Sequence, residues 1–383
     1  MSGSGPLAGL TVVDLTRVLA GPFCTLLLAD LGARVVKVEI PGRGDDARHI
    51  GPFVEGRSAY FASVNRGKES IALDLKDSAD REVFEKLLSR ADVLVENFRP
   101  GTMEKLGYGW ETLHDRHPRL IYAAASGFGH TGPYANRPAY DLVAQAMGGI
   151  MSVTGHPGAP PTRVGTSIGD IAAGLFTAVG VNAALLHRER EGRGLKIDVA
   201  MLDCQLAILE NAVARYLATG EAPGPIGARH PSITPFDAFA TGDGYVVLAV
   251  GNDALFGKLC DVLGRRELRE DPRFATNEGR TDHEGELKAE LEAILGEDGS
   301  ESWLERLGAA GIPCAPIQDV EALLRDPQVA ARNMIVELYD PEADVRLRAA
   351  GNPIKLSGFP DPKTRPPAPA LDADGDRIRR ELG

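Results

Sequence analysis

Short apolar runs alternate with amphipathic stretches through residues 1–200. The runs that predict strands are Leu10–Leu15, Arg34–Ile40, Ser70–Leu75, Val93–Phe98, Leu120–Ala125 and Lys196–Ala200. The stretches that predict helices are Phe23–Leu31, Ala79–Ser89, Asp141–Met147 and Asp170 to about Arg188. Nearly continuous apolar strands that alternate with helices are typical of a parallel sheet covered on both faces. We therefore predict an α/β fold with a doubly wound, Rossmann-like parallel sheet that forms a large domain over residues 1–200.

The pattern changes after residue 200. The parts predicted there are a linker helix region over 201–224, a small α+β domain over 225–325 and a C-terminal segment over 326–383 that returns to the large domain. The linker is predicted because a helix from Leu202 to about Ala218 is followed by the Gly- and Pro-rich stretch 220–227. The small domain has its own strand pair, Phe236–Ala240 and Tyr245–Val250.

The composition is that of an ordinary globular protein and argues against a nucleic-acid or membrane binder. Of the 383 residues, 43% are hydrophobic, and the formal net charge is −12. A strongly acidic balance argues against nucleic acid or an anionic membrane surface as a partner. The sequence shows no signal peptide and no apolar run of about 20 residues, so we expect a cytoplasmic protein without a membrane partner.

The residue types that ligate metals show no metal-binding spacing. The four cysteines lie far apart among apolar neighbours and form no C-x-x-C pair, which predicts buried free thiols. The eight histidines are scattered and match no zinc motif. We therefore expect neither a metal site nor a permanently bound cofactor.

The fold class invites a dinucleotide-binding interpretation, but the first strand-to-helix turn does not support it. The stretch from Asp14 to Phe23 has one glycine and a proline in place of G-x-G-x-x-G, so a pyrophosphate could not approach the backbone in the usual way. Glu39 ends the second strand, where a ribose-binding acid would lie, but it means little without the glycines. A P-loop and a G-x-S-x-G elbow are also absent.

The segment Thr166–Leu175 places one carboxylate, Asp170, at the start of an apolar helix. A helix N-terminus offers free N–H groups and a partial positive charge, which keep a carboxylate ionised and oriented. Two interpretations are open from these residues alone. Asp170 is either an N-cap, because Asp is a favoured cap, or a carboxylate nucleophile that divides an acyl transfer into two easier steps.

Seven segments resemble, in order, the motifs of the class III CoA-transferases, the carnitine/formyl-CoA transferase family (CaiB/BaiF-like proteins). They are Leu7–Phe23, Asp30–Ala33 with Lys37–Glu39, Asn65–Ile71, Glu96–Gly101, Gly129–Pro133, Ala139–Asp141 and Gly169–Asp170. Each segment alone is weak, but their common order over about 170 residues is specific. The resemblance continues through His230–Phe236 and looks closest to succinyl-CoA:dicarboxylate CoA-transferases.

The resemblance implies that Asp170 is the catalytic nucleophile, and this favours that role over the N-cap. Its carboxylate would attack the thioester carbonyl, forming an acyl–aspartyl anhydride and free CoA thiolate. The thiolate would then attack the aspartyl carbonyl, leaving an enzyme–CoA thioester and the first acid, and the second acid would take CoA by the reverse steps. Coenzyme A therefore enters as a thioester substrate, and backbone N–H groups can stabilise each oxyanion.

The resemblance also implies a CoA-binding groove. Its residues would be Arg17, Val18, Leu19, Ala20, Leu73, Asp74, Lys76, Asn97, Phe98, Arg99, Lys105, Ala139, Tyr140 and Asp141. The four cations among them suit phosphates or carboxylates, with a solvated surface charge as the alternative for each. Arg66 and Lys68 are weaker candidates, and Gly251 and Asn252 resemble the mobile substrate loop of the family.

The same family contains α-methylacyl-CoA racemases, which move a proton instead of CoA. Those members have a histidine at the position of Tyr140, acting with the aspartate as an acid–base pair. A tyrosine, with an ordinary pKa near 10, is a poor partner for proton exchange at neutral pH. The transferase interpretation is therefore favoured over a racemase or epimerase, and intact Asp170 argues against a non-catalytic CoA-binding protein.

The expected substrates are an acyl-CoA and a small carboxylic acid. Oxalate-using members have a glycine run in the substrate loop that this chain lacks, so the resemblance favours succinyl-CoA or a related dicarboxyl-CoA as donor. Arg137 or Arg163 could pair with a distal carboxylate, and a surface role is the alternative for each. The resemblance further implies an interlocked homodimer, in which each chain threads through the other.

Overall fold

The computed structural model describes residues 5–340 and 344–383, and the chain divides into two compact units. The large unit comprises Met1–Met151, Arg163–Ala222 and Pro327–Gly383, and the small unit comprises Ser152–Thr162 and Pro223–Asp326. The region expected as a linker, 201–224, therefore groups by its contacts with the large unit as far as Ala222.

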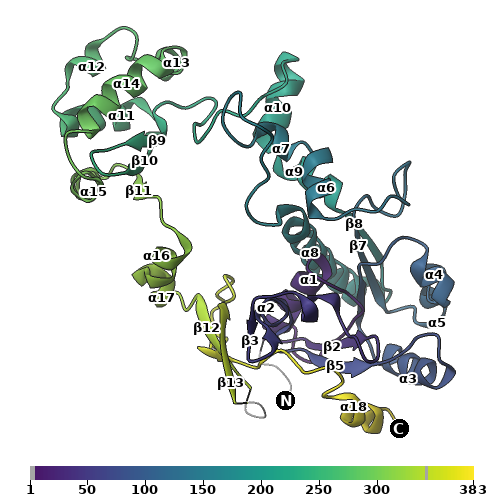
Figure 1. The fold of residues 1–383 in the computed structure, drawn as a ribbon. Coiled ribbons are helices and arrows are strands. Elements are labelled where there is room, and N and C mark those ends of the chain that lie inside the picture. The colour runs from purple at the N-terminus through teal and green to yellow at the C-terminus, as the bar shows by residue number, and fades with distance from the viewer. Residues whose placement is uncertain (1–4, 341–343) are drawn as a thin grey trace. The chain divides into compact units, whose positions relative to one another are not determined.

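A six-stranded parallel sheet forms the centre of the large unit (Figure 1). Its strands are β1 (Thr11–Asp14), β2 (Arg34–Glu39), β5 (Glu69–Ala72), β6 (Val93–Glu96), β7 (Ile121–Ser126) and β8 (Lys196–Ala200). They lie in the order β5-β2-β1-β6-β7-β8, and every neighbouring pair is parallel. This is the strand order of the doubly wound Rossmann sheet, so the predicted fold class is confirmed.

The helices of the large unit follow the predicted alternation, with one difference. They are α1 (Ala20–Asp30), α2 (Ala59–Asn65), α3 (Ser78–Leu88), α4 (Thr102–Leu106), α5 (Trp110–Arg116), α6 (Asp141–Met147), α7 (Ile150–Val153, at the sequence boundary of the units), α8 (Ile168–Glu191), α9 (Met201–Ile208), α10 (Glu210–Thr219), α17 (Pro327–Ala331) and α18 (Gly375–Leu382). The single helix predicted from Leu202 to about Ala218 is wrong. It is two helices, because the ψ of 25° at Leu209 ends α9 before α10 begins.

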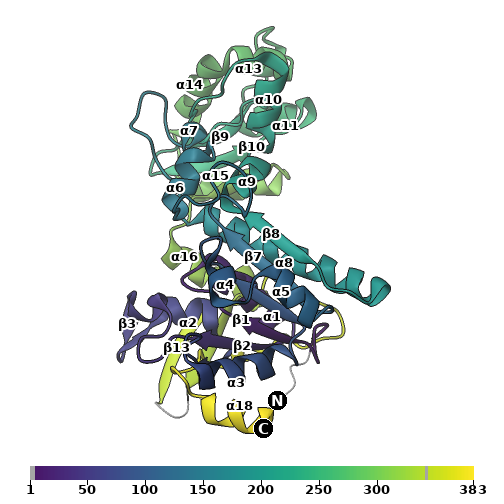
Figure 2. The same cartoon turned by 90° about the vertical axis from the view of Figure 1, so that its right-hand side faces the viewer.

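Both faces of the sheet are buried, because successive strand residues point to opposite sides. Val12 belongs to a core cluster with side chains of α1 and α8, and Val13 belongs to a second cluster with side chains of α3 and α5. Helices α1 and α8 pack side by side on their face (Figure 2). By length and composition α8 is apolar enough to cross a membrane, but ten of its 24 residues are buried, which is typical of a core helix.

The C-terminal segment adds a small sheet and then runs to the central one. The sheet consists of β12 (Ile335–Asp340), β13 (Val345–Ala350) and β14 (Thr364–Arg365). The chain ends in α18, which packs against α3 and β5 (Figure 1). Asp372 accepts the N–H of Ala72 at 2.8 Å, and Asp374 accepts the N–H of Ser70 at 2.9 Å. The last residues of the chain are thus fastened to β5.

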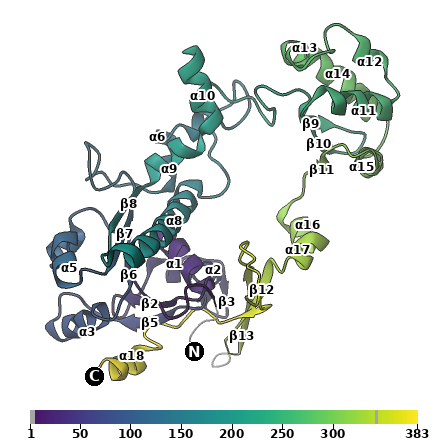
Figure 3. The same cartoon turned by 180° about the vertical axis from the view of Figure 1, so that it is seen from behind.

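The remaining elements are short pieces of the large unit and the small unit. The former are η1 (Asp46–His49), β3 (Phe53–Val54) and β4 (Arg57–Ser58). The latter are β9 (Phe236–Ala240), β10 (Tyr245–Ala249), α11 (Asp253–Leu263), α12 (Glu267–Glu270), α13 (Asn277–Asp282), α14 (Glu284–Leu295), α15 (Ser300–Ala309), β11 (Cys314–Pro316) and α16 (Val320–Arg325). In the small unit an antiparallel sheet, β11-β10-β9, and the adjoining helices α11, α14 and α15 enclose a core of their own (Figure 3).

Candidate active site

Two turns at the centre of the sheet form the floor of the candidate site. The chain turns to opposite sides after β1 and β6, and ligands bind at such a switch point, outside the carboxyl ends of the strands. The turn Arg17–Ala20 follows β1, and Asn97–Arg99 follows β6. The Asn97 side chain accepts the N–H of Arg17 and donates to its carbonyl, both at 2.8 Å. These two bonds fix the turns against each other.

The first turn contains a strained residue. Val18 has a φ of +67°, which is rare for a β-branched side chain and costs roughly 1–3 kcal/mol. Its N–H donates to the Asp45 carboxylate at 3.0 Å, and that carboxylate also accepts the N–H of Ala47 at 2.9 Å. Such strain persists only where the surroundings enforce it, so the backbone after β1 is held in one shape.

Buried charges beneath this turn hold it in place. Lys68 is fully buried, and its ammonium donates to Asp14 at 3.0 Å and to Thr25 and Asn65 at 2.8 Å. Lys37, also fully buried, pairs with Asp45 at 2.9 Å. Burial opposes ionisation of Asp14, but the two lysines and the hydrogen bonds from Thr16 and Thr25 together lower its pKa.

A cavity of about 220 Å³ opens above the two turns. The predicted residues that line it are Arg17, Val18, Leu19, Ala20, Asn97, Phe98, Arg99, Ala139, Tyr140 and Asp170. Arg137 and Asp46 line it as well. Three guanidinium groups thus face two carboxylates, and this excess of positive charge suits an anionic ligand.

A second cavity, of about 360 Å³, shares Arg17 and Phe98 with the first. Three further predicted residues line it, Leu73, Asp74 and Lys76, and many of its other walls are apolar. The Arg17 guanidinium lies 5.2 Å from the centroid of the Phe98 ring. An apolar slot that is also lined by Arg17 and Lys76 has the character needed for a planar ring that carries phosphates.

Asp170 lies in the first turn of α8 and lines the first cavity. Ser167 occupies the N-cap position and makes no side-chain capping bond, so the interpretation of Asp170 as the N-cap is wrong. Burial, together with the negative charge of Asp141, raises the pKa of Asp170 to about 7. A carboxylate held in this way is a stronger base, and hence a stronger nucleophile, than an exposed aspartate.

Asp141 lines neither cavity, although it is one of the predicted groove residues. It is buried at the start of α6, where one carboxylate oxygen accepts the N–H of Gly169 at 2.8 Å. The other oxygen accepts from the side-chain amide of Gln145, also at 2.8 Å. Asp141 therefore contacts the residue that precedes Asp170 and not the space that CoA would fill.

Two other predicted cations line neither cavity, and the predicted substrate loop belongs to the small unit. Lys105 is exposed on α4 and lines neither of them. Gly251 and Asn252 lie in the small unit, where Asn252 caps α11 by accepting the N–H of Leu255 at 2.9 Å. Arg66 is buried against Asp30, so it is not a ligand-binding cation.

Among the residues that it describes, the structure gives no catalytic or metal-binding role to the other candidates considered from the sequence. Glu39 accepts two hydrogen bonds from Arg48, at 2.6 and 2.8 Å, and one from Ser70 at 2.6 Å. The cysteines are free; Cys24, Cys204 and Cys260 are buried, and Cys314 is half-buried. Over residues 5–340 and 344–383, the structure has no group of three histidine, cysteine or acidic side chains that could hold a metal ion.

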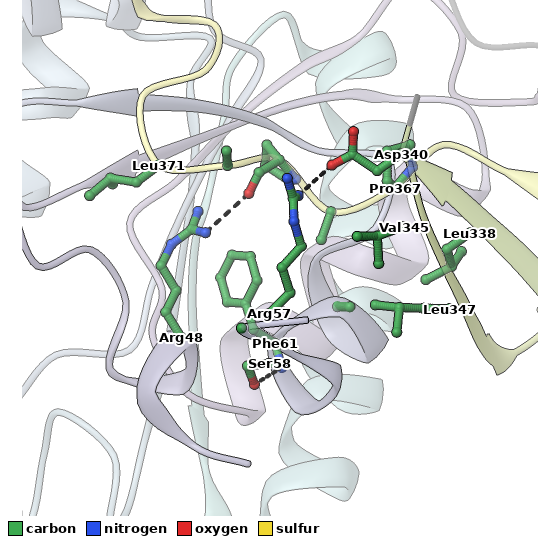
Figure 4. Close-up of a pocket in the computed structure, with 15 residues that line it drawn as sticks. Arg48, Arg57, Ser58, Phe61, Leu338, Asp340, Val345, Leu347, Pro367 and Leu371 are labelled. Atoms are coloured by element: carbon green, nitrogen blue, oxygen red, sulfur yellow. Dashed lines mark hydrogen bonds and ion pairs between the residues drawn. The ribbon is translucent and has the colours of Figure 1, made fainter. Parts of the chain in front are cut away.

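A third cavity, of about 350 Å³, lies between α2 and the β12–β13 sheet (Figure 4). Apolar side chains such as Leu338 and Leu347 line it. Its two guanidinium groups are already paired, Arg48 with Glu39 and Arg57 with Asp340. Because no charge is left over, this cavity does not have the character of a second anion site.

The sequence did not indicate Asp45 and Gln145, which hold the turn after β1 and the entry to α8. Asp45 also lines the second cavity, whereas Gln145 lines neither. Gln145 is fully buried, and its side-chain oxygen accepts the N–H of Val164 at 2.9 Å. The spacing of Asp141 and Gln145, four residues apart on a predicted helix, could have indicated one shared face. Asp45 lies in a Gly- and Asp-rich turn that carries no comparable signal.

Comparison with known proteins identifies the class. The family model for CoA-transferase family III matches residues 7–375. An acetyl-CoA:oxalate CoA-transferase from Acetobacter aceti is 50% identical, with 99% of this chain and 96% of the relative covered. A succinyl-CoA:mesaconate CoA-transferase from Haloarcula hispanica is 42% identical, with 99% and 97% covered. The crystal structure of a CaiB/BaiF family protein from Brucella suis matches with a TM-score of 0.86 at 42% identity, covering 99% of this chain and 100% of that one.

The chain belongs to CoA-transferase family III, as its motifs predicted. The match extends over nearly the whole chain and includes both units.

Proposed function

We propose that this enzyme transfers CoA from an acyl-CoA donor to a small carboxylic acid through covalent intermediates on Asp170. The observation that carries the proposal is a carboxylate of raised pKa in the first turn of α8, at the wall of a cavity rich in guanidinium groups. Attack on the donor thioester gives an acyl–aspartyl anhydride and CoA thiolate. The thiolate returns to the aspartyl carbonyl and releases the first acid, and the second acid then removes CoA by the reverse steps.

The two adjoining cavities are the proposed CoA site. The apolar slot beside Leu73 would hold the adenine, with Lys76 and Arg17 near the phosphates. The pantetheine arm would pass the Asn97–Arg99 turn and bring the thioester to Asp170. The proposal requires no resident metal or cofactor, because the thiolate and the acids supply every nucleophile.

We propose succinyl-CoA or a similar dicarboxyl-CoA as donor and a small dicarboxylic acid as acceptor. Relatives are named for succinyl-CoA with mesaconate and with glutarate, and the relative at 50% identity is named for acetyl-CoA and oxalate. Because the relative at 50% identity is named for oxalate, the missing glycine run does not exclude oxalate as a substrate. Oxalate and acetyl-CoA therefore belong in the test.

The proposed working form is a cytoplasmic homodimer. The outer face of α8 leaves large apolar side chains in solvent, with Val179 66% exposed and Leu186 56% exposed. Leu175 and Phe176 extend the same face. A contiguous exposed apolar surface of this kind marks a protein–protein contact, and a second copy of the chain would cover it.

The proposed function is tested by incubating the enzyme in deuterated water with succinyl-CoA or acetyl-CoA and a panel of carboxylic acids. We expect new acyl-CoA products without deuterium at the α-carbon, because CoA transfer leaves the α-hydrogen in place. Both readouts come from the same mass spectra. Deuterium incorporation at a rate comparable with turnover would instead favour the racemase, and CoA binding without either reaction would favour the non-catalytic protein.

We propose that Arg137 binds the distal carboxylate of the acceptor. It lines the cavity that contains Asp170, whereas the Arg163 guanidinium donates to the carbonyls of Val164 and Gly165 in its own loop. We expect Arg137→Met to raise KM about 10-fold or more for dicarboxylate acceptors and to change KM little for monocarboxylates, because one charge-assisted bond contributes about 1.5–3 kcal/mol. Arg163→Met is the matched control and should leave both KM values within about twofold. An equal rise in KM for both acid classes would contradict this assignment.

A further inference from the structure

The entry to helix α8 is fastened to α6 by two polar side chains. Asp141 accepts the N–H of Gly169 at 2.8 Å, and Gln145 accepts the N–H of Val164 at 2.9 Å. The same Gln145 amide donates to Asp141 at 2.8 Å, which joins the two contacts. The segment 164–169, which leads directly to Asp170, is therefore held at both of its ends.

The packing around Gly169 is tight. A Cβ at position 169 would lie 3.0 Å from the Asp141 oxygen and 3.4 Å from the Ala144 methyl group. Contacts of 3.0–3.4 Å are tighter than nearly all real Cβ contacts, so the two helices approach as closely as glycine permits. Asp141 and Gln145 are 7% and 0% exposed, and neither lines a cavity that could hold CoA.

We propose that Asp141 is a positioning residue of this transferase: through Gly169 it fixes the first turn of α8 and aims the Asp170 carboxylate into the cavity. This rests on the proposed function, because it takes Asp170 as the nucleophile. Asp141 also brings a negative charge close to Asp170, which makes ionisation of the nucleophile harder and the ionised form more basic. Asp141 thus directs the Asp170 carboxylate and adds to its basicity, to which the burial of Asp170 contributes most.

The charge of Asp141 acts among several others around Asp170. The groups concerned are Arg17, Asp46, Arg99, Arg137 and Tyr140, which line the same cavity, Tyr60 of α2, which interacts electrostatically with Asp170, and Asp141 on α6. The guanidinium groups are exposed toward the cavity, where solvent screens them. Asp141 is buried, so its effect on Asp170 is screened least.

Two substitutions distinguish the effect of Asp141 on the orientation of Asp170 from the effect of its charge. In Asp141→Asn the side-chain oxygen can still accept the N–H of Gly169, so the contact to Gly169 is kept while the charge and the acceptor for the Gln145 amide are lost. We expect an acidic limb near pH 7 in the pH profile of kcat/KM of the wild type and about one unit lower in this variant, with kcat at pH 8 reduced less than 10-fold. Asp141→Ala removes the acceptor as well, and we expect kcat to fall about 100-fold because the nucleophile is no longer held in line. KM for the CoA thioester should stay within about twofold in both variants.

The matched control is Asp92→Asn. Asp92 also accepts a backbone N–H, from Thr11 at 2.8 Å, and pairs with Arg188, but it lies at the opposite end of the strands. It should alter stability without moving the pH profile. If Asp141→Ala does not fold, Asp141→Asn alone decides, because it keeps the hydrogen bond to Gly169.

Different results would reject the role of Asp141 or the proposed function. An acidic limb that does not move in Asp141→Asn, or a raised KM for the CoA thioester with kcat unchanged, would overturn the proposal. Trapping with hydroxylamine in the same samples shows where the acyl group is held. A label on Asp170 with an unmoved pH profile rejects only the role of Asp141, whereas a label on another residue rejects the proposed function itself.

Discussion

Replacement of Asp170 by alanine is expected to lower kcat on the order of 10⁴- to 10⁶-fold, because it removes the nucleophile on which both covalent intermediates form. Asp170→Asn should be almost as inactive, since an amide is a negligible nucleophile. Binding of CoA should persist, because the two cavities beside the central turns remain intact. The measurements are steady-state transfer, CoA titration, and mass mapping of the wild type after treatment with donor thioester and hydroxylamine.

The thermal stability of Asp170→Asn shows whether its loss of activity comes from loss of the fold. The pKa of Asp170 is raised in the folded state, so the folded protein holds this proton more tightly than the unfolded chain does. The stabilisation from the protonated group is complete below the ordinary pKa of Asp and is lost as the pH rises through about 7. Asparagine carries no charge, so the variant should melt higher than the wild type at pH 8, with a smaller difference at pH 5. A lower melting temperature at pH 8 would contradict the origin given for the raised pKa.

Lys68→Met is expected to lower the free energy of unfolding by about 3–5 kcal/mol, because it leaves Asp14 buried with only part of its compensation. The Lys68 ammonium has four acceptors in the structure, and its side chain is fully buried. Chemical denaturation measures the loss. Lys86→Met in the same unit is the control, since Lys86 is exposed on α3 and should change stability by about 0.5 kcal/mol or less.

A double substitution tests whether the Lys68–Asp14 pair accounts for the loss of stability. Asp14→Asn added to Lys68→Met removes the uncompensated charge, so part of the stability should return and the two effects should not be additive. Additive losses would show that Lys68 acts mainly through its bonds to Pro22, Thr25 and Asn65.

The central sheet could be predicted because its strands are almost wholly apolar and each is followed by an amphipathic helix. The groove residues after β1, β5 and β6 could be placed for a related reason, since a parallel sheet brings the carboxyl ends of its strands to one edge. The orientation of Asp141 and Lys105 could not be predicted, because packing decides which face of a short helix is buried. The break at Leu209 likewise has no signal, since its neighbours are ordinary helix formers.

The buried lysines could not be recognised in the sequence for a different reason. Lys37 stands in an apolar strand, and its partner Asp45 comes from a later turn. Lys68 is matched by Asp14 and Asn65, one of them 54 residues away. A lysine that lies on the surface and one that is buried look alike in sequence until their partners are brought together by the fold.

The attachment of the C-terminus to β5 has a consequence for the open side of the sheet. β5 is an edge strand, and an edge with free N–H groups invites a strand of another molecule to pair with it. Asp372 and Asp374 occupy the N–H groups of Ala72 and Ser70, so the chain blocks this edge with its own carboxylates. Because Leu73 and Lys76 follow β5 directly, the same attachment also braces the wall of the apolar slot. The C-terminal segment therefore covers N–H groups of an exposed sheet edge and supports the segment that lines the proposed adenine site.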